Sequence, residues 1–310
     1  MTEHIKDGAP APASTNLAAN AGPLVAFALL ALIWGYNWVV MKVGLEYSGP
    51  LDFALLRVAF GALLLLGLLV ALRIPLKPPH PWKTLCLGLF QTTGFVGLIS
   101  WSLVAGAAGK SAVLAYTMPF WVIAFGWPFL PERLHGRQWV AVALALVGLV
   151  LVLELWDASG TLASSLLALA AGASWGASVV IFKKIPVHGR DELLSLTTWQ
   201  MIFGAVPLAV AAWLVEEPAI VWSGEFVFAL LYNIVGGMAI ATVLWLYILQ
   251  RLPATVSGLN SLIVPIVGVV AAWVQLGERP SAAEGVGIVL ILVALGLLTA
   301  GGGTQPVEGG

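Results

Sequence analysis

Charge is what this chain has least of. Asp, Glu, Lys and Arg make up 9% of its 310 residues, whereas a soluble domain carries about 25%. A surface so poor in charge would not keep a folded domain dissolved, which excludes the ordinary soluble classes. The net charge of -1 indicates neither a nucleic-acid partner nor a polybasic lipid tether. Hydrophobic residues reach 60% and the mean hydropathy is +0.98, values typical of a polytopic integral membrane protein.

Groups that carry out catalysis are equally scarce. Cys86 is the only cysteine, which excludes an intrachain disulfide and a multi-cysteine metal site. The histidines fall in predicted tails or links, no carboxylate lies in the middle of an apolar run, and there is no HExxH motif. An intramembrane enzyme needs a nucleophile with a base, paired acids or a metal cluster. The sequence therefore predicts no enzyme, no metal and no cofactor. The polar start also lacks the short apolar core of a cleavable signal peptide.

Long apolar runs dominate what is present. A bilayer core about 30 Å thick needs roughly 20 apolar residues of helix, and ten runs qualify. We place them at 24–44, 51–72, 83–104, 110–130, 137–155, 161–182, 193–215, 226–248, 254–276 and 283–301. The expected fold is an all-α polytopic membrane protein with ten transmembrane helices. Residues 1–23 and 302–310 are expected to be disordered tails.

The placement of Lys and Arg predicts the orientation in the membrane. If the N-terminus is inside, most of the 14 Lys and Arg residues fall in cytoplasmic segments. The outer side then holds only Lys42, Arg57, Lys110 and Arg279. We therefore expect both termini to be cytoplasmic, in a bacterial inner membrane, and the link around Glu154 and Asp157 to be external.

The sequence contains an internal repeat, because several motifs of its first half recur in the second. The stretches "ALIWGYNWVVMK" (31–42) and "ALAAGASWGASVVIFKK" (168–184) each place a Trp-Gly pair eight residues before a lysine. Pro119 and Pro265 are each followed, thirteen residues later, by Glu-Arg. Because each copy holds five spans, an odd number, the second copy must enter the membrane upside down. Two five-helix units, 24–155 and 161–301, are thus predicted as a 5+5 inverted repeat, which is a recurring transporter architecture. The alternative for the Trp-Gly pairs is close helix packing alone.

Several of these segments resemble a known family. They are "WGYNWVVMK", "WGASVVIFKK", "LLRVAFGALLLL" with Arg57, "AVLAYTMPFWVIAFGWPFLPERL" and "TVSGLNSLIVPIVGVVAAWVQLGERP". Together they resemble the drug/metabolite transporter superfamily, in its ten-helix EamA group, over residues 24–301. The resemblance implies two tandem EamA units and carriage of small metabolites, often export of amino acids. Bacterial YddG-like amino-acid exporters are the branch that it most resembles.

Polar side chains inside the spans are candidates for a solute pathway. They are costly in lipid and tend to face the protein interior or a watery cavity. The fifth and tenth predicted spans hold almost none and are expected to face lipid. The candidate lining residues are Trp34, Asn37, Gln91, Trp101, Tyr116, Trp175, Gln200, Asn233 and Asn260. For the amides, hydrogen bonds between helices are an equal alternative.

Arg57 and two prolines complete the candidate site. Arg57 is the one ionisable group placed clearly inside a predicted span, and no acid in the membrane is available to pair with it. It either snorkels or bonds to helix-end carbonyls, or it contacts a substrate carboxylate. Pro119 and Pro265 remove a backbone donor within their spans and should kink them. Each kink is either a gating point or a static bend.

The expected function is transport of a small neutral or zwitterionic metabolite, above all an amino acid. No acid or histidine lies where it could relay protons through the membrane, and no nucleotide-binding loop is present. We therefore expect a facilitative, alternating-access exporter. The alternatives are a proton-coupled exporter of drugs or other metabolites, a channel, and a membrane scaffold without transport. The expected partners are the solute and the lipid bilayer, with no nucleic acid. The oligomeric state stays open, and a monomer is compatible with the sequence.

Overall fold

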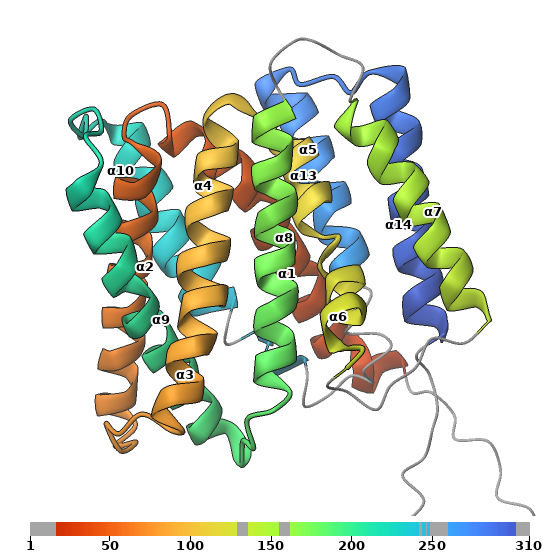
Figure 1. The fold of residues 1–310 in the computed structure, drawn as a ribbon. Helices are drawn as coiled ribbons and strands as arrows, with labels where there is room; N and C mark the ends of the chain where they lie inside the picture. The colour runs from red at the N-terminus through yellow and green to blue at the C-terminus, as the bar shows by residue number, and fades with distance from the viewer. Residues whose placement is uncertain are drawn as a thin grey trace, which may run out of the picture.

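The computed structural model describes residues 17–128, 136–154, 162–241, 244–245, 247–248 and 260–301. In these ranges every regular element is a helix (Figure 1). They are α1 (Leu17–Gly44), α2 (Pro50–Ala71), α3 (Pro81–Gly88), η1 (Leu89–Gly94), α4 (Phe95–Ala105), α5 (Ala108–Ala115), α6 (Met118–Gly126), α7 (Arg137–Leu153), α8 (Leu162–Phe182), α9 (Gly189–Leu214), α10 (Gly224–Leu231), η2 (Tyr232–Ile240), α13 (Asn260–Leu276) and α14 (Ala282–Gly301). Most of the predicted N-terminal tail, the C-terminal tail and the first Glu-Arg pair lie outside the described residues.

Several helices are long and apolar enough to cross a lipid bilayer. If helical segments that follow one another directly are counted as one run, six such runs occur among the described residues. They are Gly22–Gly44, Pro50–Ala71, Pro81–Ala105, Ala108–Gly126, Leu162–Phe182 and Gly189–Leu214. Shorter apolar helices cover Gln138–Leu153, Gly224–Ile240, Ile263–Leu276 and Ala282–Leu297. The described residues are therefore all-helical in their regular structure, and the chain is a polytopic integral membrane protein, as its composition predicts.

The first helix begins earlier than the sequence predicts. We expected it at residue 24, after a disordered tail, whereas α1 begins at Leu17. The prediction followed hydropathy, which is low before Gly22. Leu and Ala at 17–19 have high helix propensity, however, and they extend the helix beyond its apolar part.

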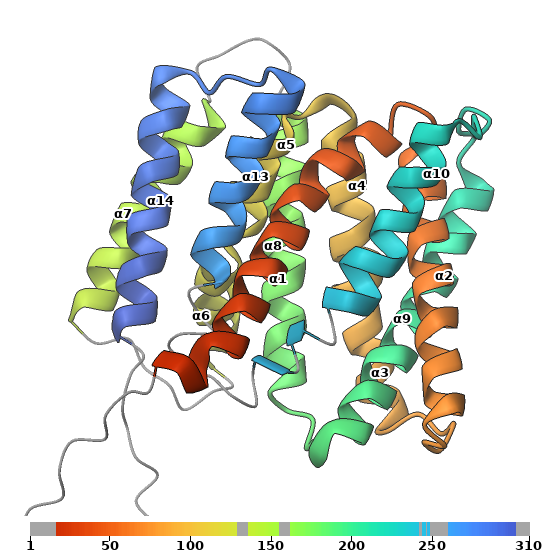
Figure 2. The same cartoon turned by 180° about the vertical axis from the view of Figure 1, so that it is seen from behind.

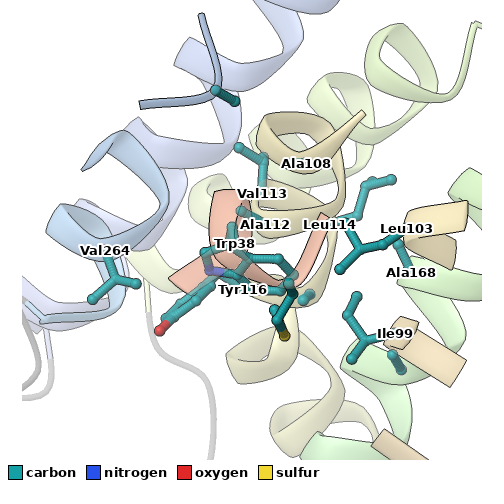
Figure 3. Packing of buried hydrophobic residues seen from close by; sticks show 14 of the residues in the cluster. Trp38, Ile99, Leu103, Ala108, Ala112, Val113, Leu114, Tyr116, Ala168 and Val264 are labelled. Atoms are coloured by element: carbon teal, nitrogen blue, oxygen red, sulfur yellow. The ribbon is translucent and has the colours of Figure 1, made fainter. Parts of the chain in front are cut away.

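The helices pack into one bundle, in which each helix meets partners that are distant in the sequence. α1 packs along α13, α8 packs on α4, α5 and α6, and α2 packs on α9. Figure 2 shows α1 crossing the bundle obliquely, beside α13. The largest cluster of buried apolar side chains includes Trp38, Ile99, Leu114 and Val264 (Figure 3). Polar groups are costly in such a centre, and their positions are therefore informative.

Helices α7 and α14 form a pair at one edge of the bundle (Figure 1). They approach closely at two glycines, because a Cβ placed on Gly148 would lie 2.7 Å from the carbonyl oxygen of Gly287. The outer faces of the pair expose large apolar side chains such as Leu146 and Val289. Both helices therefore lie at the periphery, with apolar faces suited to lipid.

Two helices contain a π-helical segment that the sequence pattern did not predict. η1 follows the eight-residue helix α3, and η2 follows the eight-residue helix α10. η1 packs on α8 and α9, whereas η2 packs on α1 and α2. A π-helix is a wider, less stable turn that occurs frequently at functional sites. The contacts of η1 with α8 and α9, and of η2 with α1 and α2, are therefore candidate positions for a functional site.

Candidate substrate site

The helix of the predicted fourth span is interrupted where Pro119 lies. α5 ends at Ala115, Tyr116 and Thr117 form a turn, and α6 begins with Pro119 in its first turn. Proline has no N–H to donate, so it suits the first turn of a helix and weakens a helix when it lies in the interior. The break therefore falls at the proline and presents Tyr116 to the centre of the bundle.

Aromatic rings surround this break. Tyr116 is 5% exposed, and its ring centroid lies 5.3 Å from that of Trp175 on α8 and 6.4 Å from that of Trp38 on α1. The ring of Phe95, at the start of α4, lies 5.1 Å from that of Trp175. Figure 3 shows Tyr116 beside Trp38 among the buried residues. These rings can form apolar walls, whereas Trp101 lies apart from them on α4 and is 44% exposed.

Polar side chains of α8 meet the π-helical segment η1. Ser178 donates a hydrogen bond to Oε1 of Gln91, and its hydroxyl also lies 2.6 Å from the carbonyl oxygen of Trp175. Ser174 donates to the carbonyl oxygen of Phe90 at 2.7 Å. The widened turn thus brings a glutamine side chain and a backbone carbonyl toward α8. Gln91 is held by a neighbouring helix rather than by its own.

Side chains of α1 meet η2 in a similar way. The indole Nε1 of Trp34 donates to the carbonyl oxygen of Gly237 at 3.1 Å, and the hydroxyl of Tyr232 donates to the carbonyl oxygen of Ile33 at 3.0 Å. Asn37 faces the same segment, since a Cβ placed on Gly237 would lie 3.4 Å from its Oδ1. This Oδ1 is buried and has no hydrogen-bond partner among the described residues. The structure therefore brings two predicted residues, Trp34 and Asn37, to one π-helical segment.

Three further buried atoms have no hydrogen-bond partner in the described part of the chain. They are Nε1 of Trp199, Oε1 of Gln200 and Nε of Arg57. Trp199 and Gln200 lie on α9, and Arg57 lies on α2, which packs on α9. An unpaired polar atom in an apolar interior costs free energy, and such atoms are rare in folded proteins. Together with Asn37, they mark polar groups that can accept or donate bonds to a solute or to water.

Arg57 lies at the junction of four helices. It is 4% exposed, and its Nη1 donates to Oδ1 of Asn233 on η2 at 3.1 Å and contacts the sulfur of Met41 on α1. Its Nη2 lies 3.5 Å from the hydroxyl of Ser100 on α4. Asn233 is oriented in turn, because its Nδ2 donates to the carbonyl oxygen of Ala229. The sequence identified Arg57 and Asn233, but it did not indicate that they touch.

The remaining predicted residues lie on α13. Asn260 is the first residue of this helix, and its side chain lies outside the described part of the structure. Pro265 lies inside α13, which continues past it to Leu276. Unlike Pro119, it does not interrupt the helix at its own position.

Charged side chains bind helix ends at the upper end of the bundle in Figure 1. Lys42 donates to two carbonyl oxygens at the end of α4, at 2.8 and 2.7 Å. Glu217 accepts from backbone N–H groups at the start of α2 at 2.9–3.1 Å, and Glu278 does the same at the start of α5 at 2.8 and 3.1 Å. Each charge has the sign that its helix end favours. In the sequence, Lys42 falls at the end of a predicted span and Glu217 and Glu278 fall in predicted links, and these contacts are not predicted, although the repeated lysine and Glu-Arg motifs are a signal of them.

Lys110 forms a second charged group at the same end. Its side chain is only 9% exposed, and its Nζ lies 2.6 Å from Oε1 of Glu284 and 3.7 Å from Oε2 of Glu154. Ser281 donates to the other oxygen of Glu154 at 2.5 Å. One lysine on α5 thus joins the end of α7 to the start of α14. Among the described residues, no group of three or more His, Cys, Asp and Glu side chains is arranged to hold a metal ion.

A bundle of apolar helices, with interrupted helices and unpaired polar groups at its centre, is the architecture of a membrane transporter. The chain belongs to the EamA-like transporter family, whose profile matches residues 22–154 and again residues 162–300. This family lies within the drug/metabolite transporter superfamily that the sequence motifs resemble. Family and relatives therefore indicate a transporter rather than an enzyme.

Curated relatives cover most of the chain. It is 29% identical over 256 residues to the "Uncharacterized transporter YoaV" of Bacillus subtilis, which covers 81% of this chain and 87% of that protein. It is 30% identical over 282 residues to the "Probable amino-acid metabolite efflux pump" of Salmonella typhimurium, which covers 86% of this chain and 91% of the pump. A solved crystal structure that is 19% identical superimposes with a TM-score of 0.61 over 92% of this chain and all of its own. That likeness bears on the fold alone.

Proposed function

We propose that this protein exports small neutral or zwitterionic metabolites, amino acids above all, from the bacterial cytoplasm. The observation that carries the proposal is that the interior of the bundle holds both a cluster of aromatic rings around Tyr116 and buried amide oxygens that have no hydrogen-bond partner among the described residues. Ligand pockets generally combine many apolar contacts with a few polar groups that orient the ligand. The name of the Salmonella typhimurium relative, "Probable amino-acid metabolite efflux pump", supports this solute class.

We further propose that the two halves form a ten-helix, 5+5 inverted repeat. The family matches twice, and α3–η1 and α10–η2 share the same sequence of an eight-residue α-helix followed by a π-helical segment. The two Trp-Gly pairs also make corresponding contacts. Gly35 packs against Val267 of α13 and Gly176 against Trp121 of α6, each two residues beyond the proline of the partner helix. Such halves can rock about a site at their interface.

Orientation follows from the charge bias of the sequence. We assign both termini to the cytoplasm and the charged helix ends around Lys42 and Lys110 to the outside. Pro119 and Pro265 lie at the contacts between the halves and are proposed as the points where the helices bend. The lining is proposed to consist of the predicted residues other than Trp101, which lies apart on α4, with Tyr116 and Trp175 as walls and Asn37, Gln91, Gln200 and Asn233 as polar groups.

The proposed transport is facilitative. In the described structure the buried Lys110 and its two carboxylates lie at one end of the bundle, and no carboxylate occupies its centre. A proton-coupled carrier typically holds a titratable group where its exposure changes between states. A solute that has accumulated in the cell would therefore leave down its own gradient.

Transport in liposomes tests the proposed function. Purified protein should exchange labelled amino acids across the membrane with saturable kinetics and without an ion gradient, whereas protein-free liposomes should not. An imposed pH gradient of either sign should not drive accumulation when the charge of the solute is unchanged. Accumulation under those conditions would establish proton coupling instead. Conductance without saturation would establish a channel. The absence of flux for every amino acid tested would contradict the proposed export of amino acids.

Gln91 offers a prediction with a matched control. Replacing Gln91 with leucine removes the acceptor of the Ser178 hydroxyl and the amide offered by η1. The loss of one such buried polar interaction should reduce transport about tenfold. Leu146→Ala changes a side chain on the lipid-facing side of α7, which is 58% exposed, and should leave transport unchanged. Equal transport by Gln91→Leu and wild type, at equal amounts of folded protein, would remove Gln91 from the site.

A further inference from the structure

The guanidinium group of Arg57 is poorly satisfied. It carries five N–H donors in a planar fork. Nη1 is occupied by Asn233 and by the sulfur of Met41, which is a weak acceptor. Nη2 has only the hydroxyl of Ser100 at 3.5 Å, and Nε has no partner in the described part of the chain. The edge formed by Nε and Nη2 is therefore the unused edge of the fork.

The charge of Arg57 is also uncompensated. Arginine stays protonated in proteins. No carboxylate pairs with it within the described ranges, and its Cζ lies over the ring of Phe53, 5.8 Å from the ring centroid. A buried cation without a counter-ion costs several kcal/mol, and such residues in membrane proteins usually mark substrate or ion pathways. A snorkelling arginine would have an exposed head, whereas this side chain is 4% exposed.

We propose that the Nε and Nη2 edge of Arg57 binds the carboxylate of the transported solute. A carboxylate accepts two parallel hydrogen bonds from this edge and supplies the missing negative charge. Asn233 holds the other side of the fork and keeps the guanidinium plane fixed while the solute is absent. This contact restricts the transported solutes to compounds with a free carboxylate, such as amino acids. Amino-acid amides and esters lack that carboxylate and are excluded. This inference rests on the proposed transport function.

The surrounding elements fit this role. Arg57 and its contacts come from α2, α1, α4 and η2, which all belong to the proposed moving halves. Asn233 lies in a π-helical segment, and such segments are rare and occur frequently at functional sites. A conformational change that separates these helices would expose the unused edge to a solute.

The test compares Arg57→Met, Arg57→Lys and wild type in liposomes, with L-leucine, L-phenylalanine and L-glutamine and the amides of the first two as probes. Wild type should exchange at least one acid and discriminate against its amide. Arg57→Met should lose about 100-fold in exchange of the acid, and Arg57→Lys should recover only part of it, because a lysine lacks the fork. Leu146→Ala should behave as wild type.

A second measurement separates this role from a structural one. Arg57→Met replaces an uncompensated buried charge with an apolar side chain of similar length, but it also leaves Oδ1 of Asn233 without its donor, so its apparent Tm in detergent should stay close to that of wild type. A lower Tm that accompanies the loss of transport would establish a structural role and overturn the proposal. So would equal exchange of acids and amides by wild type, which leaves the transporter assignment intact. If wild type moves none of the probes, both the inference and the proposed amino-acid function fall.

Discussion

Leucine in place of Gly35 or Gly176 should abolish recovery of folded protein. A Cβ placed on Gly35 would lie 2.4 Å from the Cβ and Cγ1 atoms of Val267, and one placed on Gly176 would lie 2.5 Å from the Cβ atom of Trp121. The two Cβ atoms are fixed by the backbone and cannot rotate away. Even alanine should therefore force α1 from α13, or α8 from α6, at a cost of about 1–3 kcal/mol. Leucine should prevent the contact altogether.

The measurement is the yield of monodisperse protein in detergent and its apparent Tm. Gly67 on α2 is the matched control, because a Cβ there meets nothing within 4 Å. Gly67→Ala should raise the Tm slightly, since glycine in a helix is less stable than alanine by about 0.5–1 kcal/mol. Wild-type yield and Tm for Gly35→Leu would show that α1 and α13 do not make this contact.

Loss of the Lys110 charge should also strongly lower the stability of the protein. Lys110→Met leaves the carboxylates of Glu154 and Glu284, with side chains 14% and 16% exposed, facing each other without a cation. Removing one partner of a buried ion pair costs about 3 kcal/mol, because the remaining charge is left uncompensated. The apparent Tm should therefore fall by several degrees.

A double substitution sharpens this expectation. Adding Glu284→Gln to Lys110→Met removes one of the two stranded charges and should restore most of the lost Tm. The exposed pair of Arg190 and Asp191, with side chains 54% and 68% exposed, is the control, and Arg190→Met should change little. The stabilising role of the Lys110 ion pairs is contradicted if Lys110→Met is as stable as wild type, or if adding Glu284→Gln destabilises the Lys110→Met variant further.

Much of the fold can be predicted from the sequence, because lipid imposes a simple rule. A segment that spans the bilayer must be a helix of apolar residues, and runs such as 51–72 reveal themselves by composition. The near absence of polar side chains from α7 and α14 likewise predicted their place at the edge. The sequence predicted a kink at both Pro119 and Pro265, but only the helix at Pro119 is interrupted, so proline chemistry alone does not decide where a helix breaks.

The candidate site could be predicted only in part. Tyr116 and Trp175 were selected because they are bulky or polar residues in apolar runs, and the structure brings their rings to 5.3 Å. Trp101 was selected on the same grounds and lies elsewhere, 44% exposed. Residue type indicates that a side chain is costly in lipid, but it does not indicate toward which neighbour a helix turns it.

By itself, the sequence determined that the protein is a polytopic helical membrane protein with a duplicated pattern of motifs. Only the tertiary structure decided which helices are neighbours. Arg57 meets Asn233 across 176 positions of the chain, and Lys110 meets glutamates of α7 and α14 that we had assigned to links or span ends. Hydropathy is a property of one segment at a time, whereas such contacts depend on how glycines and bulky side chains let two helices approach. For that reason the π-helical segments, the charged helix ends and the unpaired edge of Arg57 emerge only when the helices are packed together.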